Sequence, residues 1–151
     1  LSSTPHSSRL YCCDNLLSSS HVSSFVINSS LDALLYVTAT SKPQLHFASL
    51  QSLSHIVDEI ESNLLASEAS NQPLFTFSPP RPVERGARIV CSPLNSATVV
   101  LQIPRGNLEG CEPRPLVLMK SRILLDQKKY LECLLLLRKQ RVDLNLLVDH
   151  D

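Results

Sequence analysis

The segment LQIPRGNLEG, residues 101–110, separates two different hydrophobic patterns. The apolar run 99–103 ends at Pro104, which has no amide donor and therefore stops a strand. Gly106 permits a turn with positive φ, Asn107 is a good helix N-cap, and Glu109 suits the positive end of a helical turn. The segment predicts a strand-to-helix junction, with the change from β to α structure between residues 104 and 115.

Upstream of this junction the pattern is that of β-strands. Runs rich in β-forming residues, separated by turn residues, occur about every ten residues, which is typical of a β-meander. The predicted strands are 9–13, 21–28, 33–40, 44–50, 74–77, 88–92 and 97–103, with a polar turn between the first two. In 44–50, Leu45 and Phe47 alternate with polar neighbours, as in a half-buried strand. This number of strands corresponds to roughly two four-stranded units.

One segment interrupts the strand pattern. Residues 53–66 carry apolar side chains at helical spacing and acidic residues on the other face, which predicts an amphipathic helix inserted in a loop. A docking helix for a partner is the alternative.

Downstream of the junction the spacing is helical. Residues 115–127 predict a helix with Pro115 at its first position, and 128–140 predict a second helix that is apolar on nearly every side. Their very short link favours an antiparallel pair. A third helix is expected from Asp143, with Leu144, Leu147 and Val148 facing inward. Helical hairpins of this size are typical of a tetratricopeptide-like solenoid.

Charge is distributed unevenly although the formal net charge is zero. Residues 1–80 contain two basic and six acidic residues, whereas 105–141 contain nine basic and four acidic residues. A solvated helical surface explains this most simply, and a surface that contacts nucleic-acid phosphates is the alternative. The candidates for such contacts are Arg105, Lys120, Arg122, Lys128, Lys129, Arg138, Lys139 and Arg141.

The sequence carries no recognisable catalytic, cofactor or metal motif. The five cysteines include no C-x-x-C pair, which disfavours zinc, and adjacent Cys12-Cys13 suggests two buried strand thiols. The three glycines form no phosphate-binding loop, and no serine lies in G-x-S-x-G. His46 is expected to be a surface or hydrogen-bonded strand histidine, and the carboxylates at 58, 59 and 61 lie on the polar face of the predicted helix. We therefore expect no catalytic, cofactor-binding or metal-binding residue.

Modification and targeting signals are equally weak. We interpret the sequon Asn28-Ser29-Ser30 as chance. Ser78-Pro79 and Ser92-Pro93 are possible phosphorylation sites, but Ser-Pro most often marks a turn, which is the interpretation we prefer. No segment resembles a signal peptide or approaches the roughly 20 apolar residues of a membrane helix, so the cytosol is the expected compartment. The start at Leu1 and the charged end suggest a piece of a longer protein.

Several motifs together resemble one family, that of the largest subunit of the Elongator complex. The motifs are VERG at 83–86, RIV at 88–90, LQ at 101–102, PRGNLE at 104–109, LVL at 116–118 and the residues 141–150. They span about the last 70 residues, and SSFVI at 23–27 and LLYVTATS at 34–41 resemble the family more weakly.

The resemblance implies both an architecture and a function. Members of that family have two WD-type β-propellers followed by a tetratricopeptide-like α-solenoid, which would make 1–104 the end of the second propeller and 105–151 the first solenoid helices. They scaffold a complex that modifies wobble uridine of tRNA at position 5, while another subunit carries the chemistry. The resemblance thus implies a non-enzymatic chain without cofactors, with other Elongator subunits as partners. Binding of tRNA and homodimerisation would lie mainly outside this chain, and the location would be cytoplasmic or also nuclear.

Arg105 has a structural interpretation as well. It lies beside Gly106 and Asn107, where its guanidinium could bond carbonyls left open at the strand end. On that hypothesis the main role of Arg105 is to stabilise the junction, and contact with a ligand is secondary.

Overall fold

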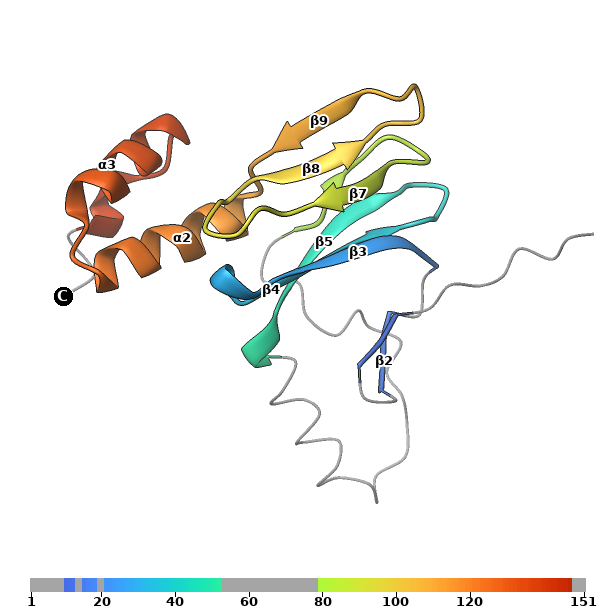
Figure 1. Cartoon of the computed structure of the whole chain (residues 1–151), viewed down its shortest axis with the longest axis horizontal. Helices are drawn as coiled ribbons and strands as arrows, with labels where there is room; N and C mark the ends of the chain where they lie inside the picture. Colours follow the sequence, from blue (N-terminus) through green and yellow to red (C-terminus); the bar gives the residue numbers. More distant parts are fainter. Residues whose placement is uncertain (1–9, 13–14, 19–20, 53–78, 148–151) are drawn as a thin grey trace, which may run out of the picture.

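The computed structural model of the chain describes residues 10–12, 15–18, 21–52 and 79–147, and it is mainly β-structure followed by helices (Figure 1). The elements are β1 (Leu10–Cys12), β2 (Asn15–Ser18), β3 (Val22–Asn28), η1 (Ser29–Leu31), β4 (Ala33–Thr38), β5 (Gln44–Ser49), β6 (Arg81–Pro82), β7 (Arg88–Cys91), β8 (Val99–Gln102), β9 (Leu108–Cys111), α2 (Arg114–Asp126), α3 (Tyr130–Lys139) and η2 (Leu144–Leu147). The predicted order of β- then α-structure is confirmed. The predicted helix at 53–66 and strand at 74–77 lie outside the described residues.

The strands form antiparallel meanders in which neighbours in sequence are neighbours in space. The sheets are β1-β2, β3-β4-β5-β6 and β7-β8-β9. Most of the predicted strands are present within a few residues of their expected ends. Three short strands were not predicted: β2 lies in the expected polar turn, β6 follows two prolines, and β9 lies beyond the expected strand-to-helix junction.

The prediction that 101–110 leads directly into a helix is wrong, because the segment is a β-hairpin. The amide of Ile103 donates to the carbonyl of Asn107 at 2.9 Å, and β9 pairs with β8 in the register Leu101 to Glu109. Gly106 has the predicted positive φ, at 88°, but Asn107 caps no helix. The residues Asn-Leu-Glu-Gly are poor in β-formers, so pairing with β8 overrides their local preference. The helix begins only at Arg114, with Pro113 as its N-cap and Pro115 in its first turn.

The structural hypothesis for Arg105 is also wrong. Arg105 is exposed in the turn of this hairpin and has no hydrogen bond or ion pair in the part of the chain that the structure describes. The carbonyl of Ile103 instead accepts from the backbone amide of Gly106, at 2.8 Å. The turn therefore satisfies the strand end without a side chain.

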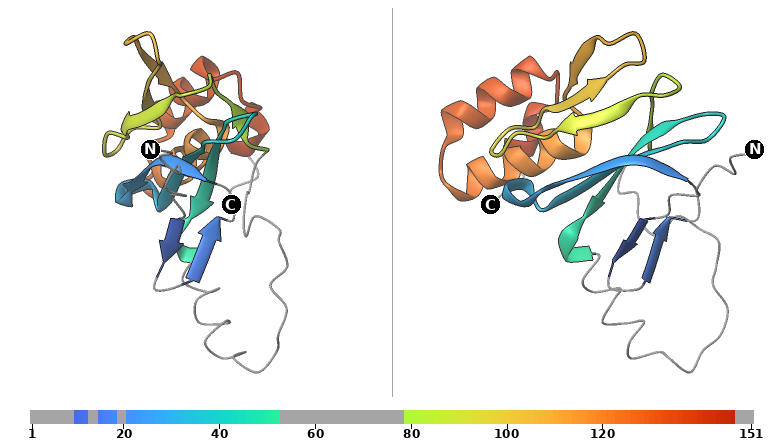
Figure 2. Two further views of the ribbon diagram at one scale, coloured as in Figure 1. Left: turned by 90° about the vertical axis from the view of Figure 1, so that its right-hand side faces the viewer. Right: turned by 45° about the vertical axis from the view of Figure 1, so that its right-hand side comes forward.

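One apolar cluster joins the two larger sheets and the helices. Strand β7 lies against β3 and β4, and the two sheets lie beside each other in Figures 1 and 2. From β4, Leu35 and Val37 point into this cluster, whereas Leu34 and Tyr36 point into a second cluster on the other face of the sheet. Strand β4 is thus buried on both faces. The half-buried pattern predicted for 44–50 is also wrong, because β5 is buried almost throughout its length.

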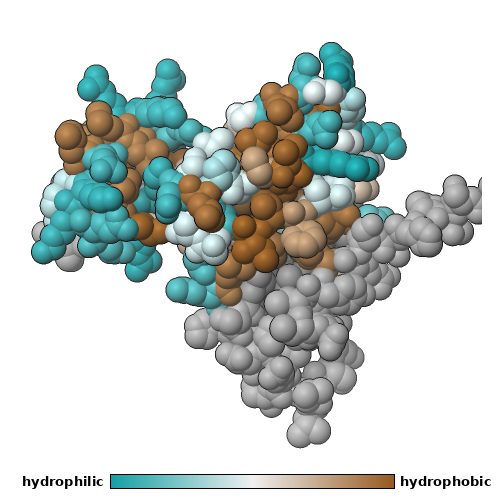
Figure 3. All heavy atoms as spheres, viewed as in Figure 1, coloured by the Kyte–Doolittle hydropathy of each residue, from teal (hydrophilic) through white to brown (hydrophobic). Residues whose placement is uncertain are grey.

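Helices α2 and α3 form the predicted antiparallel hairpin (Figure 2). Where they meet, the Cys133 thiol donates to the carbonyl of Ser121 at 3.6 Å, and both side chains are fully buried. Of α3, only Cys133 and Leu137 are buried. Leu136 is partly buried against the main cluster, and the other apolar residues of α3 form an exposed patch. We call this patch the leucine face: Tyr130, Leu131, Leu134 and Leu135. Figure 3 shows this apolar surface where α3 lies.

The third helix differs from its prediction. Residues 144–147 form the short 3-10 helix η2. Just before it, the carboxylate of Asp143 accepts from the amide of Asn145 at 3.0 Å. Leu147 packs against the main cluster, as predicted, but Leu144 is 44% exposed. Val148 lies outside the described residues.

Two leucines of α3 provide a matched test of this packing. Leu137 is fully buried, whereas Leu135 is 56% exposed on the same helix. We expect Leu137→Ala to lower the free energy of unfolding by about 2–5 kcal/mol, because it leaves a cavity in the shared cluster. Leu135→Ala should change it by no more than about 0.5 kcal/mol. Urea denaturation measures both, and equal losses would contradict the packing of α3.

The buried side chain of Asn28 links the two larger sheets. Its Nδ2 donates to Ser92 Oγ at 2.9 Å and to the carbonyl of Pro93 at 3.2 Å. Its Oδ1 accepts from Ser30 Oγ at 2.7 Å and from the amide of Leu31 at 3.2 Å. The sequon at Asn28 is therefore structural, and the Ser92 hydroxyl is buried in the same network and unavailable to a kinase.

Removing the Asn28 side chain should destabilise the contact between the sheets. Asn28→Ala leaves the buried amide of Leu31 without its acceptor and removes the bonds to Ser92 and Pro93, so we expect a loss of at least about 1–3 kcal/mol in unfolding free energy. Ser30→Ala removes two bonds at the exposed edge of the network, one donated to Asn28 Oδ1 and one accepted from the amide of Asn95. Because water can replace both, the variant should cost only about 0.5–1.5 kcal/mol. Urea denaturation of the two variants compares them. A smaller loss for Asn28→Ala than for Ser30→Ala would show that the network does not fasten the sheets.

Candidate interaction surfaces

Glu112 holds the end of the helical hairpin against the sheets. It lies between β9 and α2, and its carboxylate accepts from Lys139 Nζ at 2.9 Å and from the Gln140 side-chain amide. Thr98 Oγ1 also lies 3.5 Å from this carboxylate. Close by, Arg114 Nη1 donates to the carbonyl of Gln140 at 3.4 Å. These contacts tie the end of α3 to the point where the sheet passes into α2.

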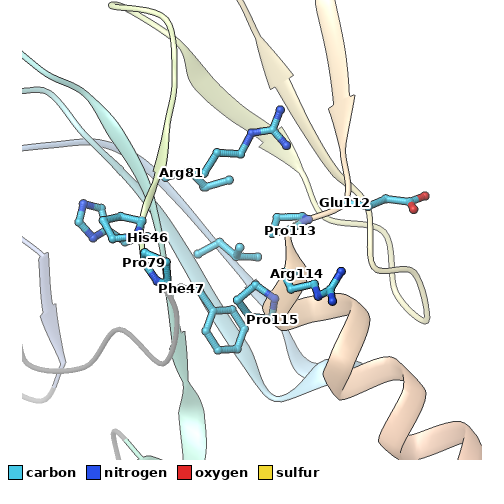
Figure 4. Close-up of a pocket in the computed structure, with 11 residues that line it drawn as sticks. His46, Phe47, Pro79, Arg81, Glu112, Pro113, Arg114 and Pro115 are labelled. Atoms are coloured by element: carbon cyan, nitrogen blue, oxygen red, sulfur yellow. The ribbon is translucent and has the colours of Figure 1, made fainter. Parts of the chain in front are cut away.

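Two cavities lie along the start of α2 and share Phe47, Arg114 and Pro115. The first has a volume of about 300 Å³ between β5, β6 and the residues before α2. Figure 4 shows Phe47 and Pro115 beside each other in it, while His46 turns to the other side of β5. The second, which we call the α2 groove, has a volume of about 480 Å³. It is lined by Phe47, Pro115, Leu118 and Met119, by Arg114 and Arg122, and by Asp32, Ser49, Gln51 and Ser52.

The basic residues predicted as candidate phosphate contacts do not form one surface. Arg105 is in the β8–β9 turn, and Lys128 and Lys129 are in the turn between α2 and α3. Arg138, Lys139 and Arg141 lie at the other end of α3, roughly 15 Å away by helical rise. Lys120 and Arg122 lie between these ends, along α2.

Sequence reasoning missed two arginines that line the cavities. Arg81 lies in β6, and its guanidinium is 3.7 Å from the carboxylate of Glu109. Arg114 lines both cavities, but in the sequence it stands out only as one of the basic residues of 105–141. Only the pairing of distant strands and the late start of α2 place them there.

The buried titratable groups have environments that disfavour charge. Burial raises the pKa of the Cys111 thiol, an effect that nearby Arg81 partly opposes, and burial also raises the pKa of the Cys133 thiol. Both thiols are therefore protonated near neutral pH and poor nucleophiles. Cys91 is exposed, and the side chains of Cys12 and Cys13 lie outside the described residues, as do the carboxylates at 58, 59 and 61.

His46 is buried rather than on the surface. Its ring stacks on Tyr36 with 4.8 Å between centroids, and its Nε2 lies 3.5 Å from Thr38 Oγ1. Its Nδ1 has no hydrogen-bond partner among the residues that the structure describes. Burial lowers the pKa of His46 below its ordinary value of 6.5, so the fold favours the neutral ring.

His46 should make stability depend on pH. Because the folded state binds the proton more weakly, the contribution is complete above the ordinary pKa of 6.5 and is lost as the pH falls below it. The loss is at most about 1.4 kcal/mol per pH unit for one group. We expect His46→Phe to flatten the dependence of the urea midpoint between about pH 7.5 and 5. His21→Phe, at an exposed position, is the control; if it flattened the profile as much, His46 would not be the group responsible.

The sheets followed by an antiparallel helical hairpin define the class as β-structure that continues into α-helices. Residues 114–151 match the family model described as ELP1 alpha-solenoid. In addition, no helix of the described residues is long and apolar enough to cross a membrane.

The chain is similar to Elongator complex protein 1 from several organisms. The Drosophila melanogaster protein is 51% identical over 71 residues, which cover 47% of this chain and 6% of that protein. The Oryctolagus cuniculus protein is 38% identical over 95 residues, covering 63% and 7%. The Schizosaccharomyces pombe protein is 46% identical over 71 residues, covering 47% and 6%. The resemblance to the family of the largest Elongator subunit is thereby confirmed, and the chain spans only 6–7% of the length of these relatives.

Proposed function

We propose that this chain is a non-catalytic scaffold segment of an Elongator-type complex that modifies wobble uridine of tRNA at position 5. The name of the relatives supports membership of such a complex. The observation that carries the scaffold role is the leucine face of α3, where Leu131 is 69% exposed on a helix whose other side is fully buried. An apolar face of this kind is typical of helices that pack against further protein.

The finer architecture belongs to the same proposal. The two antiparallel meanders would be WD-type blades of a propeller, and α2 with α3 would be a tetratricopeptide-like hairpin. The four-stranded sheet β3-β4-β5-β6 has the strand number of such a blade. The partners would be other Elongator subunits, and the compartment the cytoplasm, with the nucleus as a second one. Homodimerisation and most tRNA contacts would lie outside this chain.

Direct contact with tRNA is the competing function. Lys128 and Lys129 favour it, because both are exposed in one turn and the exposed aromatic ring of Tyr130 follows them. Cations beside an aromatic side chain can contact phosphates and stack on bases. The separation of the other basic residues reduces the number of phosphates that one such surface could contact.

Assembly and tRNA binding can be tested separately. We expect the tagged chain, expressed with the other Elongator subunits, to co-purify with them, and Leu131→Lys with Leu135→Lys to abolish most of this. Arg105→Glu, at the exposed hairpin turn, is the control and should leave co-purification unchanged.

A titration with tRNA between about 50 and 200 mM salt tests the competing function. We expect Lys128→Glu together with Lys129→Glu to leave the affinity for tRNA unchanged. The reverse pattern, with tRNA affinity lost and assembly intact, would establish the competing function.

A further inference from the structure

The α2 groove combines an apolar floor with a cationic edge. Phe47, Pro115, Leu118 and Met119 form the floor, and Leu118 and Met119 remain half-exposed there. Methionine is an adaptable apolar side chain that recurs at surfaces accepting different partners. The floor can therefore take up the apolar side chains of a ligand.

The acidic group in the groove already has partners. The carboxylate of Asp32 accepts from Ser49 Oγ at 2.6 Å and from the amide of Gln51 at 3.2 Å. Arg114 and Arg122 are exposed on α2, and neither forms an ion pair within the described ranges. Two positive charges thus outweigh one carboxylate that is occupied by hydrogen bonds.

The spacing of the two arginines limits the kind of ligand. They are eight residues apart on one helix, so their Cα atoms are separated by roughly 12 Å. In an extended peptide, that distance corresponds to about four residues. A segment with carboxylates at this spacing could pair with both arginines while the apolar residues between them rest on the floor.

We propose that the α2 groove binds an acidic peptide segment of a partner protein, with apolar side chains on Leu118 and Met119 and carboxylates on Arg114 and Arg122. This surface is distinct from the leucine face, because it lies on α2 and β5 rather than on the outward side of α3. It therefore adds a second interaction surface to the proposed scaffold, and its test is independent of assembly through α3.

A synthetic peptide can test the groove directly. The probe is a labelled peptide with a central run of leucine and phenylalanine flanked by glutamates, and the control peptide carries lysines in place of the glutamates. By fluorescence anisotropy, we expect the chain to bind the acidic peptide and not the basic one, with affinity that falls as salt rises. Arg122→Glu together with Arg114→Glu should weaken binding about tenfold or more.

Two further variants keep the result interpretable. The double variant also loses the contact of Arg114 with Gln140, which could disturb the fold. Arg122→Glu alone keeps that contact and should still weaken binding, and thermal denaturation checks the fold of both variants. Arg105→Glu makes the same charge change outside the groove and should leave affinity unchanged. Equal binding of both peptides, equal loss with Arg105→Glu, or no loss with Arg122→Glu would overturn the proposal. Binding that appears only after deletion of residues 53–78 would show that the chain's own segment is the occupant, and would overturn it as well.

Discussion

The structure depends on one apolar cluster that both larger sheets and the helical hairpin share. Leu35 in β4, Val99 in β8, Leu116 in α2 and Leu137 in α3 all belong to it and are at most 2% exposed. None of these elements buries its apolar side alone, because a three-stranded sheet or a pair of short helices has too little surface for an independent core. The sheets therefore determine where the helices pack, and the helices in turn cover apolar residues of the sheets.

The shared cluster also explains why so little chain separates sheet from helix. Only Glu112 and Pro113 lie between the end of β9 and the start of α2, and Pro113 itself is the N-cap of the helix. With such a short connection, α2 begins next to the sheet edge, and the return of α3 brings Lys139 and Gln140 back to Glu112. The junction is thus a closed arrangement in which one carboxylate receives donors from the far end of the hairpin.

The elements with strong periodicity were predictable from the sequence, and those determined by long-range pairing were not. Strands β3, β4 and β5 and helices α2 and α3 carry their own pattern of apolar residues, so local reasoning located them. Strand β9 has no such pattern: Gly110 and Glu109 become a strand only because β8 offers backbone partners. The same limit applies to the sites. The network of Asn28 joins residues more than sixty positions apart, and the α2 groove joins β5 to α2, so neither could be read from spacing along the chain.

The exposed apolar surface of the hairpin lies in two places, and each corresponds to one of the two proposed interaction surfaces. Helix α2 is buried along Leu116, Val117, Leu124 and Leu125, and its groove side is half-exposed at Leu118 and Met119. Helix α3 has the opposite balance, with two residues buried and the leucine face exposed (Figure 3). A large apolar face without charges at its centre suits permanent packing against further protein, whereas a narrower apolar floor edged by arginines suits a charged, exchangeable ligand. Helix α2 thus anchors the hairpin to the sheets and carries the groove of the proposed peptide site, while α3 carries the leucine face on which the proposed scaffold role rests.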